Sequence, residues 1–322
     1  HPRDRRQRQM CIRDRLNDRS SNKNRGKVLS IYMIILYGSM GLGMFMLNFS
    51  SPEKFQPFIL ISVLMSAALL PILLTKRKPP QFKKIQSMSL RDLYNSSPLG
   101  MVSAVLYGIV QSALFTLLAV YAAAMNFSIF DISLVTFLLA ISGAVSQYPV
   151  GYISDKFDRR KVIIYSTFGA AIFAFLAIFS VGTMYLPEGL GSSKLWFYIF
   201  LVLFSVCSLP MFSLILAHTN DFITRDKFVA AGAGLQFAFG LGAISGPFLC
   251  SLLMGLVGNN GFFVFLIFFH CVIGFYGIHR MKVRPSEDNP DSQFVAVPTT
   301  ITPVGLELNP CLLYTSDAAD DL

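Results

Sequence analysis

Eight long apolar blocks that contain no Lys, Arg, Asp or Glu constrain this 322-residue chain more than any other feature. About 20 such residues cross the roughly 30 Å hydrocarbon core of a bilayer as a helix. Because lipid offers no hydrogen bonds, a spanning backbone has to satisfy its own polar groups, and helices do so. We therefore predict eight transmembrane helices, at residues 28–49, 56–74, 99–125, 132–153, 162–186, 195–217, 228–257 and 261–279.

The composition favours a membrane protein and argues against an enzyme. Hydrophobic residues make up 53% of the chain and charged residues 14%, whereas a soluble protein carries about 25% charged residues. The five cysteines follow no metal or disulfide spacing. The sequence also lacks H-E-x-x-H, G-x-S-x-G and a phosphate-binding glycine loop. We expect no catalytic residues, no cofactor and no metal.

The basic residues predict the orientation of the helices. Between residues 23 and 284, eighteen Lys and Arg residues lie in connections on one side of the predicted bilayer, and two, Lys54 and Lys194, lie on the other. The positive-inside rule then places the richer side, and both ends of the chain, in the cytoplasm of a plasma or inner membrane. The basic residues that set the orientation in the membrane therefore account for the net charge of +9. No basic stretch is interleaved with aromatics as a nucleic-acid groove would require.

A dense charged stretch, Gly-Tyr-Ile-Ser-Asp-Lys-Phe-Asp-Arg-Arg-Lys at residues 151–161, separates two of the apolar blocks. On charge alone it is a short turn that its charges keep in water. Its spacing also resembles the signature loop of the major facilitator superfamily, roughly G-x-x-[SA]-D-[RK]-x-G-R-[RK]. Asp158 stands where glycine is most usual. The positions that fit are Gly151, Ser154, Asp155, Lys156, Arg159 and Arg160.

The resemblance implies an all-α, polytopic bundle of membrane helices with the major facilitator fold. In that superfamily the loop recurs in the second half, between the eighth and ninth of twelve helices. Here it follows the fourth predicted helix, so the eight helices match family positions five to twelve and the first four are lacking. The alternative register, positions one to eight, would place the basic linker after two helices and leave the motif without its counterpart.

This register divides the chain into five parts. The expected parts are a basic tail at 1–24, the last two helices of the first bundle at 25–75, a cytoplasmic linker at 76–98, a six-helix second bundle at 99–281, and a tail at 282–322. Residues 10–15 and 311–321 resemble translated sequencing-adapter read-through, so both ends are excluded from the fold prediction.

By resemblance, the chain is a secondary active or facilitative transporter, an antiporter or symporter, that moves a drug, sugar or metabolite by alternating access. A membrane scaffold or sensor on the same fold is the alternative. The expected partners are the small solute, the lipid bilayer and, as a coupling ion, protons; nucleic acid is not expected. The apolar blocks hold no carboxylate. Either the coupling residue lies outside them or transport proceeds without protons.

The family also implies which helices line the substrate cavity: 99–125, 132–153, 195–217 and 228–257. Polar residues in these blocks are the candidate substrate contacts, through hydrogen bonds, and hydrogen bonding between helices is the alternative role. These candidates are Tyr107, Gln111, Gln147 and Gln236. In block 228–257, Gly242 and Gly246 predict close helix packing, and Pro247 permits a bend. His270 is expected to be structural, whereas His218 fits either role.

The charged turn is expected to act as a conformational latch formed by Gly151, Asp155, Lys156, Arg159 and Arg160. An acid at the C-terminal end of a helix is disfavoured by the helix dipole, so Asp155 needs a compensating partner. Arg159 or Arg160 could supply it, and so could the helix start near Lys27 and Val28. At the opposite end of the same predicted helix, Ser128 and Asp131 have the spacing of a capping box.

Overall fold

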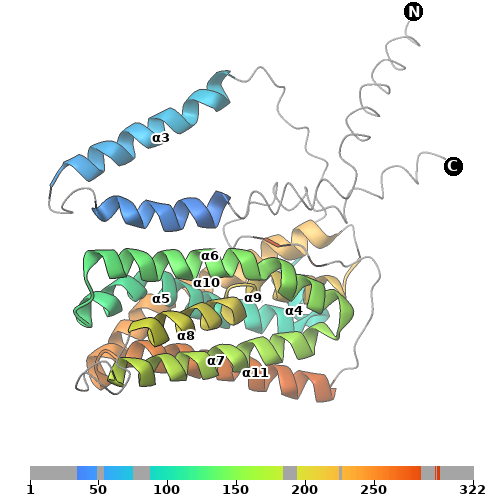
Figure 1. The fold of residues 1–322 in the computed structure, drawn as a ribbon. Coiled ribbons are helices and arrows are strands. Elements are labelled where there is room, and N and C mark those ends of the chain that lie inside the picture. Colours follow the sequence, from blue (N-terminus) through green and yellow to red (C-terminus); the bar gives the residue numbers. More distant parts are fainter. Residues whose placement is uncertain are drawn as a thin grey trace, which may run out of the picture.

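The structure, a computed structural model, describes residues 35–48, 54–74, 88–183, 194–224, 227–283, 294 and 296–297. Within these ranges the chain is helical and contains no strand. Figure 1 shows the arrangement of the helices. In chain order they are a helix at Ile35–Phe45, η1 (Met46–Asn48), α3 (Gln56–Leu74), α4 (Leu90–Ser96), α5 (Pro98–Ala124), α6 (Ile129–Lys156), α7 (Arg159–Thr183), α8 (Lys194–Ser208), α9 (Met211–Asn220), α10 (Phe228–Val257) and α11 (Gly261–Val283).

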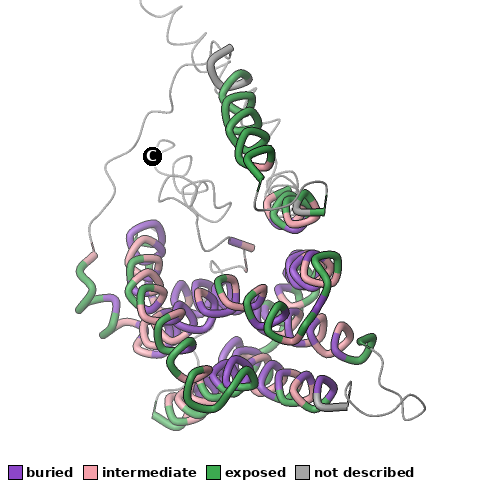
Figure 2. Tube along the Cα trace, turned by 90° about the vertical axis from the view of Figure 1, so that its left-hand side faces the viewer, coloured by how far each residue is buried: buried purple, intermediate pink, exposed green. Residues whose placement is uncertain are grey.

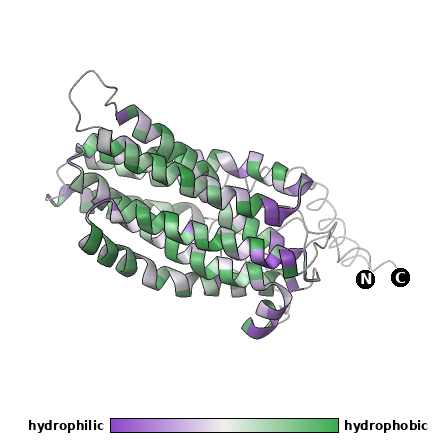
Figure 3. Ribbon diagram, turned by 90° about the horizontal axis from the view of Figure 1, so that it is seen from below, coloured by the Kyte–Doolittle hydropathy of each residue, from purple (hydrophilic) through white to green (hydrophobic). Residues whose placement is uncertain are grey.

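Six spans are long and apolar enough to cross a membrane: α5, α6, α7, α8 together with α9, α10 and α11. They coincide with the six predicted blocks between residues 99 and 279, which confirms those blocks as membrane-capable helices. Their apolar residues run along the helices while hydrophilic residues collect at the helix ends (Figure 3). The other two blocks contain the shorter helix Ile35–Phe45 and α3; the beginning of the first block lies outside the described residues.

The start of α6 has the predicted cap. The Ser128 side chain accepts a hydrogen bond from the backbone N–H of Asp131 at 3.1 Å, and the Asp131 carboxylate accepts one from the backbone N–H of Ser128 at 3.2 Å. These two bonds satisfy donors that a helix start otherwise leaves unpaired. The capping-box prediction is confirmed.

The predicted continuous helix over 195–217 is wrong in one respect. The span is interrupted by a turn at Leu209 and Pro210, which separates α8 from α9. Proline has no N–H to continue the helix ladder, and it disfavours helical geometry at the preceding residue. Leaving aside Pro98 at the first position of α5, the two other prolines in the six spans, Pro149 and Pro247, remain inside α6 and α10. The chain therefore breaks at one of three candidate prolines.

Helices α5 and α10 approach each other so closely that glycine is required at their contact. A Cβ atom added to Gly242 would lie 2.0 Å from the carbonyl oxygen of Val105, and one added to Gly246 would lie 2.2 Å from that of Ile109. From the other side, a Cβ on Gly108 would lie 2.1 Å from the Phe239 carbonyl oxygen. Small residues allow such backbone-to-backbone packing between membrane helices. Gly240 has nothing within 4 Å of an added Cβ and lies off this contact.

Several helix ends meet at one end of the bundle, which we call the Arg159 end. The α6–α7 turn lies there, and Arg159 reaches the end of α9. Gly100, near the start of α5, contacts Thr219 near the end of α9. Leu93 of α4 packs against Gly234 near the start of α10. Consecutive spans of the bundle are therefore antiparallel, and the polar residues of each can be placed by their distance from this end.

The helix at Ile35–Phe45 packs on α6, whereas α3 stands clear of the bundle (Figures 1 and 2). The Phe45 ring contacts the rings of Phe130 and Phe137 at centroid distances of 6.0 and 5.5 Å. The Asn48 side-chain amide donates to the Ser133 hydroxyl at 2.9 Å. Helix α6 thus connects the six-helix bundle to the N-terminal pair of helices.

Candidate functional site

The charged turn is organised around the buried guanidinium of Arg159, the first residue of α7. Its Nη2 donates to the carboxylate of Asp155 at 2.7 Å, one helical turn earlier in the chain. Its Nη1 donates to the carboxylate of Asp221, which directly follows α9, and to the carbonyl oxygen of Ala217 at 3.2 Å. Charge-assisted bonds of this kind are among the strongest in proteins. Arg159 therefore joins α6, α7 and the end of α9.

Arg160 makes a second, local ion pair with Asp158. Its side-chain Nη2 and Nε donate to the Asp158 carboxylate at 2.7 and 3.0 Å, and its backbone N–H donates at 3.0 Å. Burial raises the pKa of Asp158, but the hydrogen bonds from Arg160 outweigh burial and leave the pKa below its ordinary value. Asp158 stands at the position where the family motif usually has glycine, so here the turn is closed by a charge pair.

The remaining turn residues have different surroundings. Lys156 lies over the ring of Tyr152, 4.2 Å from its centroid, at the surface of α6. Gly151 faces the ring of Phe294, whose Cδ1 would lie 2.3 Å from an added Cβ. The carboxylate of Asp155 accepts a further bond from the backbone N–H of Phe294 at 2.9 Å. The expected partners of Asp155 at Lys27 and Val28 lie outside the described residues.

Tyr107 ties α5 to the break between α8 and α9. Its hydroxyl donates to the carbonyl oxygen of Leu209 at 3.3 Å, and its ring lies 6.1 Å from the Phe239 ring of α10. Leu209 also fills the space beside Gly143 of α6, where an added Cβ would lie 2.1 Å from Leu209 Cδ1. The turn at Leu209 and Pro210 is thus packed between α5 and α6, and the Tyr107 hydroxyl is hydrogen-bonded to it.

Gln111 and Gln147 are buried without complete hydrogen bonding in the described structure. Each side chain belongs to a residue that is 4% exposed. The Oε1 atom of Gln111, and both Oε1 and Nε2 of Gln147, have no hydrogen-bond partner among the described residues. A buried polar group left without a partner costs roughly 1–3 kcal/mol. Membrane-spanning helices that retain such groups have amide atoms free to bind a ligand.

Three of the four candidates lie at the same depth. Tyr107 follows the start of α5 by nine residues, Gln147 precedes the end of α6 by nine, and Gln236, which is half-buried, follows the start of α10 by eight. At 1.5 Å per residue, these positions are about 12–14 Å from the Arg159 end. Gln111 lies one turn deeper, on the Tyr107 face of α5. The polar candidates therefore occupy one layer, which we call the polar layer, about a third of the way along these spans from the Arg159 end.

The two histidines discussed above, His270 and His218, are buried. His270 of α11 has both ring nitrogens in contact with polar atoms: Nε2 lies 3.0 Å from the Ser208 hydroxyl and Nδ1 lies 2.8 Å from the Leu266 carbonyl oxygen. This arrangement fits a structural role at the end of α8. The ring of His218 lies beside that of Phe222, with the centroids 5.0 Å apart. Among the described residues, no group of His, Cys, Asp and Glu is arranged to hold a metal ion.

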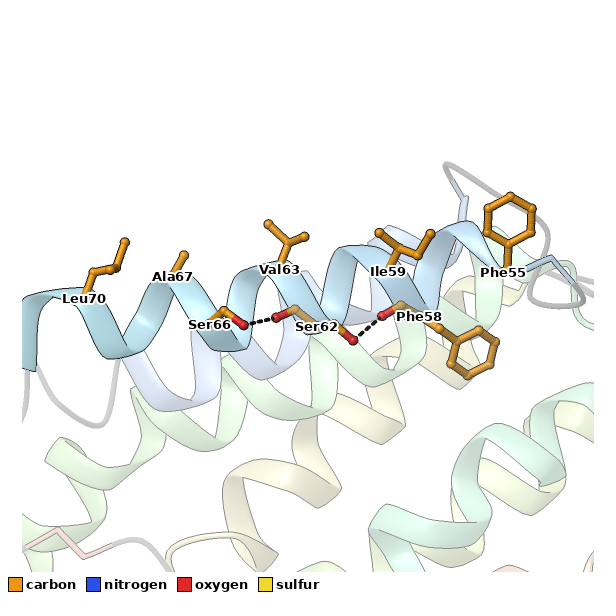
Figure 4. Close-up of a pocket in the computed structure, with 8 residues that line it drawn as sticks. All are labelled: Phe55, Phe58, Ile59, Ser62, Val63, Ser66, Ala67 and Leu70. Carbon is orange, nitrogen blue, oxygen red and sulfur yellow. Dashed lines mark hydrogen bonds between the residues drawn. The ribbon is translucent and has the colours of Figure 1, made fainter. Parts of the chain in front are cut away.

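An open apolar surface runs along one side of α3, away from these polar residues. Figure 4 shows Phe55, Ile59 and Val63 pointing away from the other helices, whereas the Phe58 ring points to the other side of α3. The hydroxyls of Ser62 and Ser66 donate to carbonyl oxygens of their own helix at 3.0 and 2.9 Å. With its polar groups already engaged, this surface is suited to apolar contact and not to recognition of a polar solute.

Two participants in the charged turn, Asp221 and Phe294, were not predicted from the sequence. An acid immediately after the block at 195–217, on the same side of the membrane as the motif, was a usable signal for Asp221. Phe294 contributes a backbone N–H to Asp155 from a position 139 residues later in the chain. A backbone donor carries no sequence signal, so no pattern could have found it.

Comparison with known proteins identifies relatives over most of the chain. The family model described as Major Facilitator Superfamily matches residues 16–175 and 100–315. An uncharacterized MFS-type transporter, YcaD of Escherichia fergusonii, is 24% identical over 248 residues, which cover 76% of this chain and 61% of that protein. The uncharacterized MFS-type transporter YE1530 of Yersinia enterocolitica is 23% identical over 276 residues, covering 85% and 67%. No solved structure matches. The chain thus spans 61–67% of the length of these two relatives.

Proposed function

Because the chain belongs to the Major Facilitator Superfamily, we propose that it moves a small solute across a membrane by alternating access. In this mechanism two helix bundles rock about a site near the middle of the bilayer. Both relatives reported above bear the name of transporters, whereas nothing favours the scaffold or sensor alternative. The six-helix bundle α5–α11 supplies one half of the site, and the Ile35–Phe45 helix belongs to the other bundle.

The observation that carries this proposal is the Gln147 amide, which is buried in a membrane-capable helix without a hydrogen-bond partner in the described structure. It lies at the depth of Tyr107 and Gln236, on the Arg159 side of the midplane, and Gln111 lies one turn deeper, near the middle of α5. An amide offers both a donor and an acceptor. A solute with uncharged hydroxyl or amide groups would pair with Gln147 and Gln111, and the energetic cost of their burial would be removed when it binds.

The Arg159 end is proposed to face the cytoplasm. This orientation rests on the excess of Lys and Arg residues in the connections on that side. The network of Arg159, Asp155 and Asp221 would then hold the cytoplasmic ends of α6, α7 and α9 together as one unit. Such a unit can move as a rigid body, as the rocking of one bundle against the other requires.

The positions of the acidic residues in this bundle bear on whether it couples transport to protons. Asp131 and Asp155, the two acids of α6, lie in its first and last turns, and the other five spans have no acid in their interiors. A proton relay inside a membrane ordinarily uses a carboxylate or histidine. His270 has both ring nitrogens engaged, and His218 lies near the end of α9 beside Phe222. We therefore propose that α5–α11 recognises the solute, and that any carboxylate used in coupling belongs to the other bundle.

The test is solute entry into proteoliposomes that contain the purified protein, compared with protein-free liposomes of the same lipid. Radiolabelled lactose and glucose serve as neutral probes, and ethidium serves as a cationic probe. The expected result is faster entry of at least one neutral probe and no acceleration of ethidium. An imposed pH gradient then tests coupling. Acceleration of ethidium alone would contradict a site for neutral solutes, and acceleration of none of these probes would contradict the proposed function.

A further inference from the structure

A short part of the chain beyond the last helix is inserted among the membrane helices. It consists of the described residues Phe294, Ala296 and Val297, which we call the inserted segment. Val297 is 3% exposed, as buried as the core of the bundle. Figure 2 shows this piece as a short coloured length of tube beside the helices. Burial of a residue from outside the helices indicates a groove that accepts an extended peptide.

At each end of the groove, a polar side chain hydrogen-bonds to the backbone of the inserted segment. At the Arg159 end, the Asp155 carboxylate accepts the backbone N–H of Phe294 at 2.9 Å, and the Phe294 ring covers Gly151. At the inner end, the Ser213 hydroxyl accepts the backbone N–H of Val297 at 3.0 Å and donates to the Val297 carbonyl oxygen at 3.3 Å. A single hydroxyl thus satisfies both backbone groups of Val297, which buried backbone requires.

The inserted segment reaches toward the layer of polar candidates. Ser213 precedes the end of α9 by seven residues, or about 10 Å at 1.5 Å per residue. Gln147 precedes the end of α6 by nine residues and lies one turn before Gly151 on the same face. Val297, bonded to Ser213, therefore lies within about half a helical turn of the depth of Gln147. The segment occupies the stretch between the Arg159 end and the candidate site.

The inserted segment also contacts the other bundle. Ala296 packs against a cluster formed by Tyr37 of the N-terminal helix and Ala140 and Ala144 of α6. The segment is consequently bounded by α6, α9 and the Ile35–Phe45 helix. The boundary between the two bundles is where a solute leaves an alternating-access site, so a peptide seated there stands in its path.

We propose that α6 and α9 form a peptide-binding groove whose ligand is the chain's own inserted segment, and that the seated segment blocks solute exchange at the Arg159 end. The blocking role rests on the proposed transport function; the groove and its occupant do not. Withdrawal of Val297 would free Ser213 and open the way to Gln147. The device is autoinhibitory, because the protein supplies both the groove and the peptide.

The first test measures occupancy without relying on transport. Gly151→Cys and Phe294→Cys are combined in the full protein after replacement of Cys11, Cys207, Cys250, Cys271 and Cys311. Copper phenanthroline is expected to form a disulfide in this pair, because the Phe294 ring lies against the position that a Cβ on residue 151 would occupy. The matched control pairs Phe294→Cys with Gly240→Cys, since Gly240 has nothing within 4 Å. Equal cross-linking in both pairs would overturn the proposal.

The second test measures what the segment shields. Ala144→Cys, in the same cysteine-free background, is labelled from the Arg159 side in inside-out vesicles with a membrane-impermeant methanethiosulfonate. Val297→Asp is expected to raise the labelling rate about ten-fold, the factor that corresponds to 1.4 kcal/mol of lost apolar burial. Val297→Ile preserves an apolar side chain and should leave the rate unchanged. An unchanged rate in Val297→Asp, at equal recovery of folded protein, would overturn the groove.

Transport then tests the blocking role. Cross-linked Gly151→Cys/Phe294→Cys protein should exchange solute more slowly than the same protein after reduction with dithiothreitol. Equal exchange rates in the two forms would overturn autoinhibition. If neither form moves lactose, glucose or ethidium, the transport function fails, whereas the cross-linking and labelling results still decide whether the segment occupies its groove.

Discussion

The charged turn and the polar layer of the bundle both bury polar side chains, but the buried arginines of the turn have partners, whereas the Gln147 amide of the layer has none among the described residues. At the turn, the guanidinium of Arg159 is buried against two carboxylates and a carbonyl oxygen. In the polar layer, Gln147 is at least as buried, with 4% exposure against 8% for Arg159, yet both of its amide atoms lack a partner in the described structure. The two sites therefore differ in whether their buried polar groups have partners, and not in how deeply those groups are buried.

This difference separates a stabilising role from a binding role. A buried charge held by its partners is costly to remove, because the partners remain buried and unpaired. A buried amide without partners is a cost that the fold already bears, so its removal is close to neutral for stability. Substitutions at the turn should therefore damage folding, whereas substitutions of the unpaired amides in the polar layer should spare folding and damage function.

Arg159→Ala is expected to have the largest effect on stability. The change leaves Asp221, whose side chain is 10% exposed, without its cationic partner. Loss of one member of a buried pair costs about 3–5 kcal/mol. Unfolding in detergent, followed by the fluorescence of the single tryptophan, Trp196, measures the loss. Lys156→Ala is the control because Lys156 lies at the surface. A similar, small loss in both variants would make the turn an ordinary solvated loop.

Gly246→Ala is expected to cause the second-largest loss of stability. It measures the cost of disturbed helix packing without a change of charge. The new methyl group would lie 2.2 Å from the Ile109 carbonyl oxygen, so α5 and α10 would have to separate. Overpacking of this kind costs about 1–3 kcal/mol. Gly240→Ala, on the same helix, meets nothing within 4 Å and should be neutral or gain up to about 1 kcal/mol from helix propensity. Equal unfolding midpoints for the two variants would refute the close contact.

Asp158→Asn tests the weaker pair of the turn through its pH dependence. The folded-state pKa of Asp158 is lowered, so its contribution to stability is present above the ordinary carboxyl pKa of about 3.9 and is lost as the pH falls below it. The variant should therefore be less stable than the parent at pH 7, and the difference should shrink toward pH 3. Unfolding midpoints at both pH values provide the measurement; a constant difference would contradict the charge pair.

The membrane helices could be read from the sequence because hydrocarbon excludes charge at every position of a span. Uncharged blocks therefore predicted the six spans from α5 to α11. The break at Pro210 could not be predicted, since Pro149 and Pro247 occupy similar apolar surroundings and stay helical. Whether a proline ends a helix depends on the neighbours that accept its freed carbonyl groups, and those neighbours belong to other helices.

The residue types of the candidate site could be predicted from the sequence, but the hydrogen-bond and ion-pair partners of those residues could not. Glutamines in apolar blocks identified Gln111 and Gln147, and the motif identified Arg159. The structure was needed to show that the Tyr107 hydroxyl bonds the Leu209 carbonyl while Gln147 has no partner among the described residues. Asp221 and Phe294 were missed for the same reason, because they approach Asp155 and Arg159 through tertiary contacts.

Gln147→Leu tests the central claim most directly, through the initial rate of neutral-solute entry into proteoliposomes at matched protein content. The change removes an unpaired amide and keeps the side-chain volume similar, so the unfolding midpoint should stay the same or rise slightly. Loss of one hydrogen-bonded pair with the solute should slow entry about ten-fold at limiting solute concentration. An unchanged entry rate together with a lowered unfolding midpoint would show that Gln147 serves the fold and not the solute.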